Sequence, residues 1–92
     1  MWYVYILQSE VNDSFYKGHT NNMAFRLKEH NNKEEPYTRK FAPWKLCWCC
    51  MKPDKKSAYQ LELKLKNLTR KRLEDFITKY KDENVAWLIV RP

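Results

Sequence analysis

The sequence has no long hydrophobic run, a single glycine and only three cysteines. No stretch reaches the roughly 18 apolar residues that a membrane-spanning helix needs. The apolar start at residues 2–7 has no basic segment before it and no small-residue cleavage site after it, so it does not match a signal peptide. We therefore expect a cytoplasmic protein without a membrane partner.

The three cysteines, Cys47, Cys49 and Cys50, lie within four consecutive positions. An odd number of closely spaced cysteines makes a poor disulfide framework, and the spacing differs from the paired C-x-x-C motifs of zinc sites. We expect these residues to be reduced and partly buried thiols.

Acidic residues are outnumbered by basic ones. The chain has 18 lysines and arginines against 11 acidic residues, a formal net charge of +7 over 92 residues. A surplus of this size on a short chain favours binding to a polyanion such as nucleic acid over a role in solubility alone. The hydrophobic fraction suffices for one small core, so we expect a single domain over residues 1–82 and an apolar C-terminal extension over residues 83–92.

The first third of the chain predicts a β-hairpin followed by a helix. Residues 2–9 are rich in aromatic and β-branched side chains, residues 12–14 have turn chemistry, and a second apolar run begins at residues 15–16. Gly18 lies where the second strand should end, which indicates a backbone position that requires glycine. Apolar residues at helical spacing predict a short amphipathic helix over residues 22–30.

The middle of the chain predicts a loop and then a third strand. Residues 31–43 are polar and bounded by prolines, which is typical of a loop with at most one helical turn. Residues 44–51 are dense in aromatic and sulfur side chains, so we expect a buried central strand that completes a three-stranded sheet.

Two helices and an apolar tail are expected after this strand. Asp54 or Ser57 can cap the first helix, and the second helix restarts at Thr69. The tail over residues 85–90 is too apolar to be free in solvent, and a short edge strand, a packed extension and a dimer contact are all open to it.

Two tripeptides carry a family resemblance. Val4-Tyr5-Ile6 and Tyr16-Lys17-Gly18, whose tyrosines are 16 − 5 = 11 positions apart, resemble the signature of the GIY-YIG nuclease superfamily. The likeness continues through these matching positions: Thr20, Arg26, Leu27, His30, Tyr37-Thr38-Arg39, Pro43-Trp44-Lys45-Leu46 and Ser57 to Lys66. The chain most resembles the small stand-alone bacterial members. It departs from the pattern at Val4, at Lys17 and at His19.

The resemblance implies a fold and a reaction. The expected fold is α/β of the α+β type, a small three-stranded antiparallel sheet flanked by helices. The reaction is hydrolysis of a phosphodiester bond with one Mg²⁺ or Mn²⁺ ion. The implied catalytic residues are Tyr5, Tyr16, Arg26, His30 and Glu62.

Each implied catalytic residue suits its chemistry. Glu62 supplies the carboxylate that Mg²⁺ prefers, and Arg26 can clamp the scissile phosphate. Tyr5 is our choice of general base, and a nearby cation would have to lower the pKa of its phenol. His30 can carry a proton or orient the phosphate. The residues assigned to substrate binding are Lys17, Gly18, Tyr37, Arg39, Lys40 and Lys45. The last four combine aromatic and basic side chains, which suits binding to an unpaired strand of nucleic acid.

The leading hypothesis is therefore a metal-dependent endonuclease that acts on DNA more than RNA, with branched, damaged or single-stranded DNA as the substrate. The rival is a nucleic-acid-binding module that has lost turnover, to which Lys17 and His19 point. A third hypothesis is an interaction protein that forms homo-oligomers through Val85–Val90. We expect His19 itself to be an ordinary surface or capping histidine.

Overall fold

Three antiparallel strands form a sheet with the order β2-β1-β3 in the computed structural model, which describes residues 1–90. The strands are β1 (Trp2–Ser9), β2 (Phe15–Thr20) and β3 (Trp44–Lys52). Both pairs are antiparallel. The sheet and its flanking helices confirm the expected α+β class.

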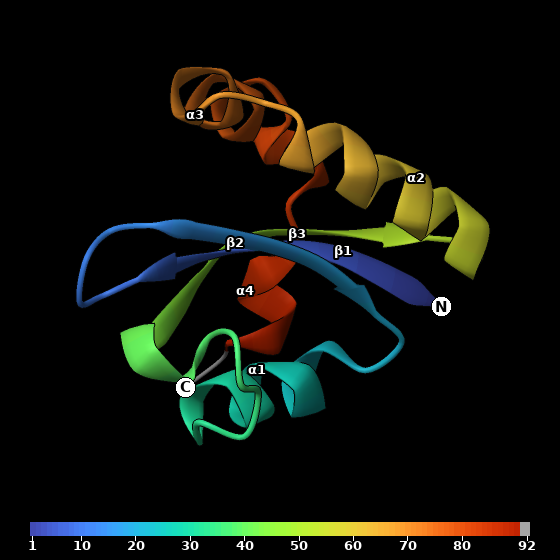
Figure 1. The fold of residues 1–92 in the computed structure, drawn as a ribbon. Coiled ribbons are helices and arrows are strands. Elements are labelled where there is room, and N and C mark those ends of the chain that lie inside the picture. Colours follow the sequence, from blue (N-terminus) through green and yellow to red (C-terminus); the bar gives the residue numbers. More distant parts are fainter. Residues whose placement is uncertain (91–92) are drawn as a thin grey trace.

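Helices cover both faces of the sheet (Figure 1). Helices α2 (Lys55–Lys66) and α3 (Arg70–Lys79) lie on one face, and α1 (Met23–Asn31) and α4 (Ala86–Ile89) lie on the other. Two short 3₁₀ helices, η1 (Arg39–Phe41) and η2 (Lys81–Glu83), complete the chain. None of the helices within residues 1–90 is both long and apolar enough to cross a membrane.

Strand β1 separates two hydrophobic clusters because its side chains alternate between the faces. Val4 and Ile6 join the cluster beneath α2 and α3, and Tyr5 and Leu7 join the cluster beneath α1 and α4. All four side chains are buried. The central strand is therefore β1.

Strand β3 is an edge strand, so the expectation that residues 44–51 form the central strand was wrong. Its apolar character has another cause: helices cover both faces, and the chain after η2 covers its free edge. The Asn84 side chain accepts a hydrogen bond from the Cys49 N–H at 3.0 Å and donates one to the Cys47 carbonyl at 3.3 Å. The Val85 N–H donates to the Cys49 carbonyl at 2.7 Å.

The apolar tail is a packed extension. Ala86 is buried in the cluster beneath α1 and α4, with Val85 and Ile89 packed against it. Trp87 remains 66% exposed, so a dimer contact through this segment stays a prediction.

Local signals in the second half of the chain behave as expected. Asp54 caps α2 by accepting a hydrogen bond from the Ser57 N–H at 2.7 Å, and Thr69 caps α3. Cys49 and Cys50 are buried, and all three thiols are free.

Candidate active site

Gly18 and Tyr5 face each other across the hairpin. A Cβ atom on Gly18 would lie 2.6 Å from Tyr5 Cζ, closer than side-chain carbons approach one another. Gly18 does not have a positive φ. The glycine that the sequence singled out is therefore required by the close approach of the phenol rather than by backbone conformation.

The hydroxyl of Tyr5 belongs to a buried hydrogen-bonded chain. Tyr5 Oη lies 3.0 Å from His30 Nε2, and His30 Nδ1 lies 2.7 Å from Thr38 Oγ1. All three side chains are at most 1% exposed. Helix α1 contributes His30, and the loop after it contributes Thr38, whose carbonyl accepts a hydrogen bond from the Trp44 indole at 2.9 Å.

Burial sets the protonation of this chain. It raises the pKa of Tyr5 well above its ordinary value, and Arg26 opposes only part of that increase. Burial, aided by the positive charge of Arg26, lowers the pKa of His30 to about 4. At neutral pH the Tyr5 phenol is therefore protonated and the His30 imidazole is neutral, with one nitrogen able to accept a proton.

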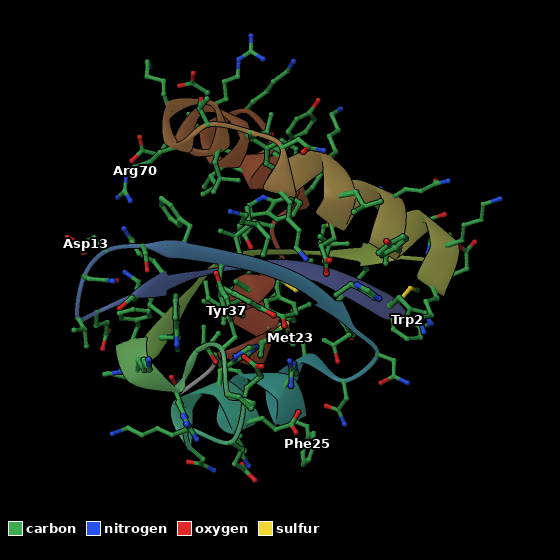
Figure 2. The ribbon with its side chains drawn as sticks, in the orientation of Figure 1. Trp2, Asp13, Met23, Phe25, Tyr37 and Arg70 are labelled. Atoms are coloured by element: carbon green, nitrogen blue, oxygen red, sulfur yellow. The ribbon has the colours of Figure 1, made fainter. Side chains whose placement is uncertain are left out.

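Tyr16 connects this buried chain to the surface. Its ring centroid lies 5.1 Å from that of His30, 5.8 Å from that of Tyr37 and 6.2 Å from that of Trp44. Tyr37 is 76% exposed, on the loop between α1 and β3 (Figure 2). The aromatic rings therefore run from the core to an open face at the free edge of β2.

A pocket of about 510 Å³ opens at this edge, lined by Phe15, Tyr16, Lys17, Tyr37 and Lys66. Because β2 is an edge strand, residues from both faces of the sheet meet around it. Burial and the nearby charge of Lys66 lower the pKa of Lys17. Two cationic and three aromatic side chains suit a phosphate beside a nucleobase.

One wall of the pocket is braced from α3. The Arg70 guanidinium donates a hydrogen bond to the Asp13 carbonyl at 2.8 Å and lies over the Phe15 ring at 4.7 Å. Figure 2 shows Arg70 extending from α3 toward the hairpin turn that carries Asp13. The turn and Phe15 are therefore held against α3.

Glu62 is a buried carboxylate beside the pocket. Its side chain is 8% exposed, and its two oxygens lie 2.8 Å from His19 Nδ1 and 2.9 Å from Lys66 Nζ. The expectation that His19 is an ordinary surface histidine was wrong, because the ring packs against α2 and contacts Glu62. Lys66 both pairs with Glu62 and lines the pocket.

Glu62 is the carboxylate beside the pocket that could serve as a metal ligand. Within residues 1–90, no group of three or more His, Cys, Asp or Glu side chains could hold a metal. Mg²⁺ commonly keeps several waters and takes one or two protein carboxylates. Glu62 can therefore serve as one ligand once an ion replaces His19 or Lys66 at one of the two carboxylate oxygens.

Arg26 lies on α1, the helix that also carries His30. It pairs with Glu29 at 3.3 Å, and its side chain is 27% exposed. Burial is the main cause of the shifted pKa values of Tyr5, Tyr16 and His30, and the positive charge of Arg26 lowers the pKa of each. Arg26 is not among the residues that line the pocket, so its role as a phosphate clamp stays a prediction.

The remaining predicted binding residues lie apart from the pocket lining. Arg39 and Lys40 are exposed on η1, and Lys45 is exposed on β3, at the opposite edge of the sheet from β2. The structure therefore brings Lys17 and Tyr37 to the pocket but not Arg39, Lys40 or Lys45.

Four contributors were absent from the predicted set: Phe15, His19, Thr38 and Lys66. Strand alternation gave a signal for His19, since Lys17 and His19 must share the face opposite Gly18. The i,i+4 spacing of Glu62 and Lys66 gave another. Nothing local indicates that Thr38 contacts His30.

Known proteins resemble this chain over nearly its whole length. The family model described as the GIY-YIG catalytic domain matches residues 1–81. A UPF0213 protein of Bacillus velezensis is 36% identical over 91 residues, covering 98% of this chain and 91% of that protein. A UPF0213 protein of Clostridium perfringens is 39% identical over 87 residues, covering 91% and 92%.

A solved structure agrees with these relatives. The solution NMR structure of a UPF0213 protein from Bacillus halodurans superposes with a TM-score of 0.56 at 34% identity, covering 85% of this chain and 84% of that one. Sequence and fold lead to one assignment: the chain belongs to the GIY-YIG family and carries a nuclease-type domain.

Proposed function

We propose that this protein is an endonuclease that hydrolyses phosphodiester bonds in DNA with the help of one Mg²⁺ or Mn²⁺ ion. Family membership supports a nuclease-type activity. Metal dependence, the choice of DNA and the roles of the site residues are our inferences.

One observation carries the proposal: Lys66 connects the buried carboxylate to the basic pocket. Its Nζ lies 2.9 Å from Glu62 Oε2, and the same side chain lines the pocket with Lys17 and Tyr16. A phosphate in the pocket would therefore lie next to Glu62, the carboxylate to which we assign a divalent ion. Such an ion, when bound, supplies neutralisation of the phosphoryl oxygens and lowers the pKa of a water.

Arg26, Lys17 and Lys66 supply the remaining positive charge. Hydrolysis builds negative charge on the phosphoryl oxygens, and fixed cations that face those oxygens stabilise the transition state. We assign the phosphate clamp to Arg26, whose planar fork makes paired hydrogen bonds.

We assign to the Tyr5–His30 pair the role of accepting the proton of the attacking water. Burial makes a free Tyr5 phenolate unfavourable. The Tyr5 hydroxyl can accept a proton from the water while it donates its own proton to His30 Nε2, 3.0 Å away. In this way no free phenolate forms. Burial is the main cause of the low pKa of His30 and the charge of Arg26 adds to it, so a negative phosphate would offset only the contribution of Arg26. Tyr16, which lines the pocket, orients the water from the solvent side.

The exposed ring of Tyr37 favours unpaired DNA. Tyr37 is 76% exposed and lies beside Tyr16, so it offers a free face on which a base can stack. A branched, damaged or single-stranded substrate presents such a base.

One observation favours the alternative of an inactive nucleic-acid-binding module. Both oxygens of Glu62 already have partners, His19 and Lys66. A carboxylate satisfied in this way has less need of a metal ion. Under this alternative the pocket binds nucleic acid and no bond is cut.

The test is a cleavage and binding assay on labelled duplex, flapped, branched and single-stranded DNA and RNA, with Mg²⁺ or Mn²⁺. We compare the wild type with Arg26→Ala and with Lys28→Ala, which removes an exposed cation from the same helix. We expect Arg26→Ala to lower cleavage by about 10²-fold and Lys28→Ala to change it little. Binding without cleavage by the wild type would support the inactive module.

A further inference from the structure

His19 and Glu62 bring an imidazole nitrogen and a carboxylate oxygen together from different elements of the fold. His19 comes from β2 and Glu62 from α2, 43 residues later, and Nδ1 lies 2.8 Å from Oε1. Atoms at this separation can serve as neighbouring ligands of one metal ion. In zinc sites, for example, nitrogen and oxygen ligands each lie about 2.0–2.2 Å from the metal.

Packing holds the His19 ring in place. Its centroid lies 5.7 Å from that of Trp2 and 5.7 Å from that of Tyr59, so aromatic rings of β1 and α2 flank it. Figure 2 shows Trp2 at the end of the sheet where α2 begins. The side chain is 19% exposed, so solvent reaches it. A ligand fixed in this way loses little conformational freedom when it binds an ion.

The charges around the pair oppose a weakly bound cation. Lys66 Nζ lies 2.9 Å from the other Glu62 oxygen, and Lys55 lies over the Trp2 ring at 5.5 Å. An ion held by one carboxylate oxygen alone would compete poorly in these surroundings. A nitrogen ligand adds affinity chiefly for transition metals, because imidazole suits them better than it suits Mg²⁺.

We propose that His19 and Glu62 together form a two-ligand site for a divalent transition-metal ion. This site binds Mn²⁺ in preference to Mg²⁺. This inference rests on the proposed function for the role of Glu62 and adds His19 as a direct ligand. Waters complete the coordination, since residues 1–90 offer no group of three suitable side chains. The site selects the ion, and Arg26, Lys17 and Lys66 bind the phosphate.

The alternative is that His19 only hydrogen-bonds to Glu62 and orients it. The two roles differ in one observable, direct bonding between nitrogen and metal. Electron spin-echo envelope modulation of bound Mn²⁺ detects a coordinated ¹⁴N nucleus, and it needs neither nucleic acid nor turnover. The chain has only two histidines, and the other, His30, is 0% exposed and bonded at both nitrogens.

The experiment titrates Mn²⁺ and Mg²⁺ into the wild type, His19→Asn, His19→Phe and Glu62→Gln, with folding checked by circular dichroism. Asparagine keeps a hydrogen-bond donor for Glu62, and phenylalanine keeps the ring packing, so one of the two should fold even if the other does not. We expect a coordinated ¹⁴N signal in the wild type that both His19 variants lose. We also expect the ratio of Mn²⁺ to Mg²⁺ affinity to fall about tenfold or more in both.

The outcomes separate this inference from the proposed function. If wild-type Mn²⁺ shows no ¹⁴N signal, or if His19→Asn keeps the signal and the affinity ratio, His19 is not a ligand, although Glu62-dependent cleavage would still stand. If Glu62→Gln binds Mn²⁺ as tightly as the wild type, the metal role of Glu62 fails and the two-ligand site fails with it.

Discussion

The phenol of Tyr5 occupies the space that a Cβ atom on Gly18 would need, with Cζ 2.6 Å from that position. Tyr5 is buried, and its hydroxyl is fixed on His30. The glycine is therefore part of the site, because it sets where the phenol lies.

Gly18→Ala should displace Tyr5 or strand β2. We expect the free energy of unfolding to fall by about 1–3 kcal/mol, together with loss of cleavage. In a Tyr5→Leu background, the shorter side chain leaves room for the methyl group. Adding Gly18→Ala should therefore lower the free energy of unfolding little further. Urea unfolding of the four proteins measures this coupling. Additive effects of the two substitutions would show that the contact does not constrain Gly18.

His30 should make stability depend on pH. Its pKa is about 4 in the folded protein and about 6.5 in an unfolded chain. Between these values the unfolded chain binds more protons, so the free energy of unfolding rises with pH, and the full contribution is present above about pH 6.5.

We expect His30 to account for a loss of about 2 kcal/mol when the pH falls from 7 to 4.5. The side chain of His30→Gln cannot be protonated, so this variant should lack the pH dependence of stability that comes from His30. It should keep the pH dependence that comes from carboxylates. Urea unfolding of both proteins at several pH values isolates the difference. Parallel pH profiles would contradict a buried neutral His30.

Lys66→Gln should weaken nucleic-acid binding, because Lys66 lines the pocket. Loss of one phosphate contact should reduce the slope of log affinity against log salt by about one. Lys64→Gln is the matched control, since it removes an exposed cation from the same helix outside the pocket lining. Fluorescence anisotropy at several salt concentrations compares the two, and equal slopes would argue against phosphate binding in the pocket.

Tyr37→Ala should lower affinity for single-stranded DNA by about 1–3 kcal/mol if a base stacks on the ring. Stability should change by no more than about 0.5 kcal/mol, because the side chain is 76% exposed. Phe25→Ala, which removes another exposed aromatic ring from α1, is the control (Figure 2). An unchanged affinity in Tyr37→Ala, or an equal loss in Phe25→Ala, would remove Tyr37 from the binding surface.

Much of the fold follows from local signals in the sequence. The hairpin, the caps at Asp54 and Thr69, and the apolar periodicity of α2 and α3 each depend on residues close together in the chain. The position of β3 in the sheet does not follow from local signals. An edge strand that is covered by helices and by Asn84 has the same apolar composition as a central strand.

The site was predictable where the family motif names residues, and less so where contacts join distant segments. Tyr5, Tyr16, Arg26, His30 and Glu62 were named from the resemblance, and the structure places Tyr5, Tyr16 and His30 in contact. The pairing of His19 with Glu62 spans 43 residues. It depends on how α2 packs on the sheet, which residue patterns alone do not specify.

The most direct test of the central claim is DNA cleavage by Glu62→Gln with Mg²⁺ or Mn²⁺. Its control, Glu83→Gln, removes an exposed carboxylate on η2. We predict that Glu62→Gln loses cleavage by about 10²-fold or more and still binds DNA, whereas Glu83→Gln cuts like the wild type. Equal cleavage by all three proteins under identical purification would contradict a catalytic site built on Glu62.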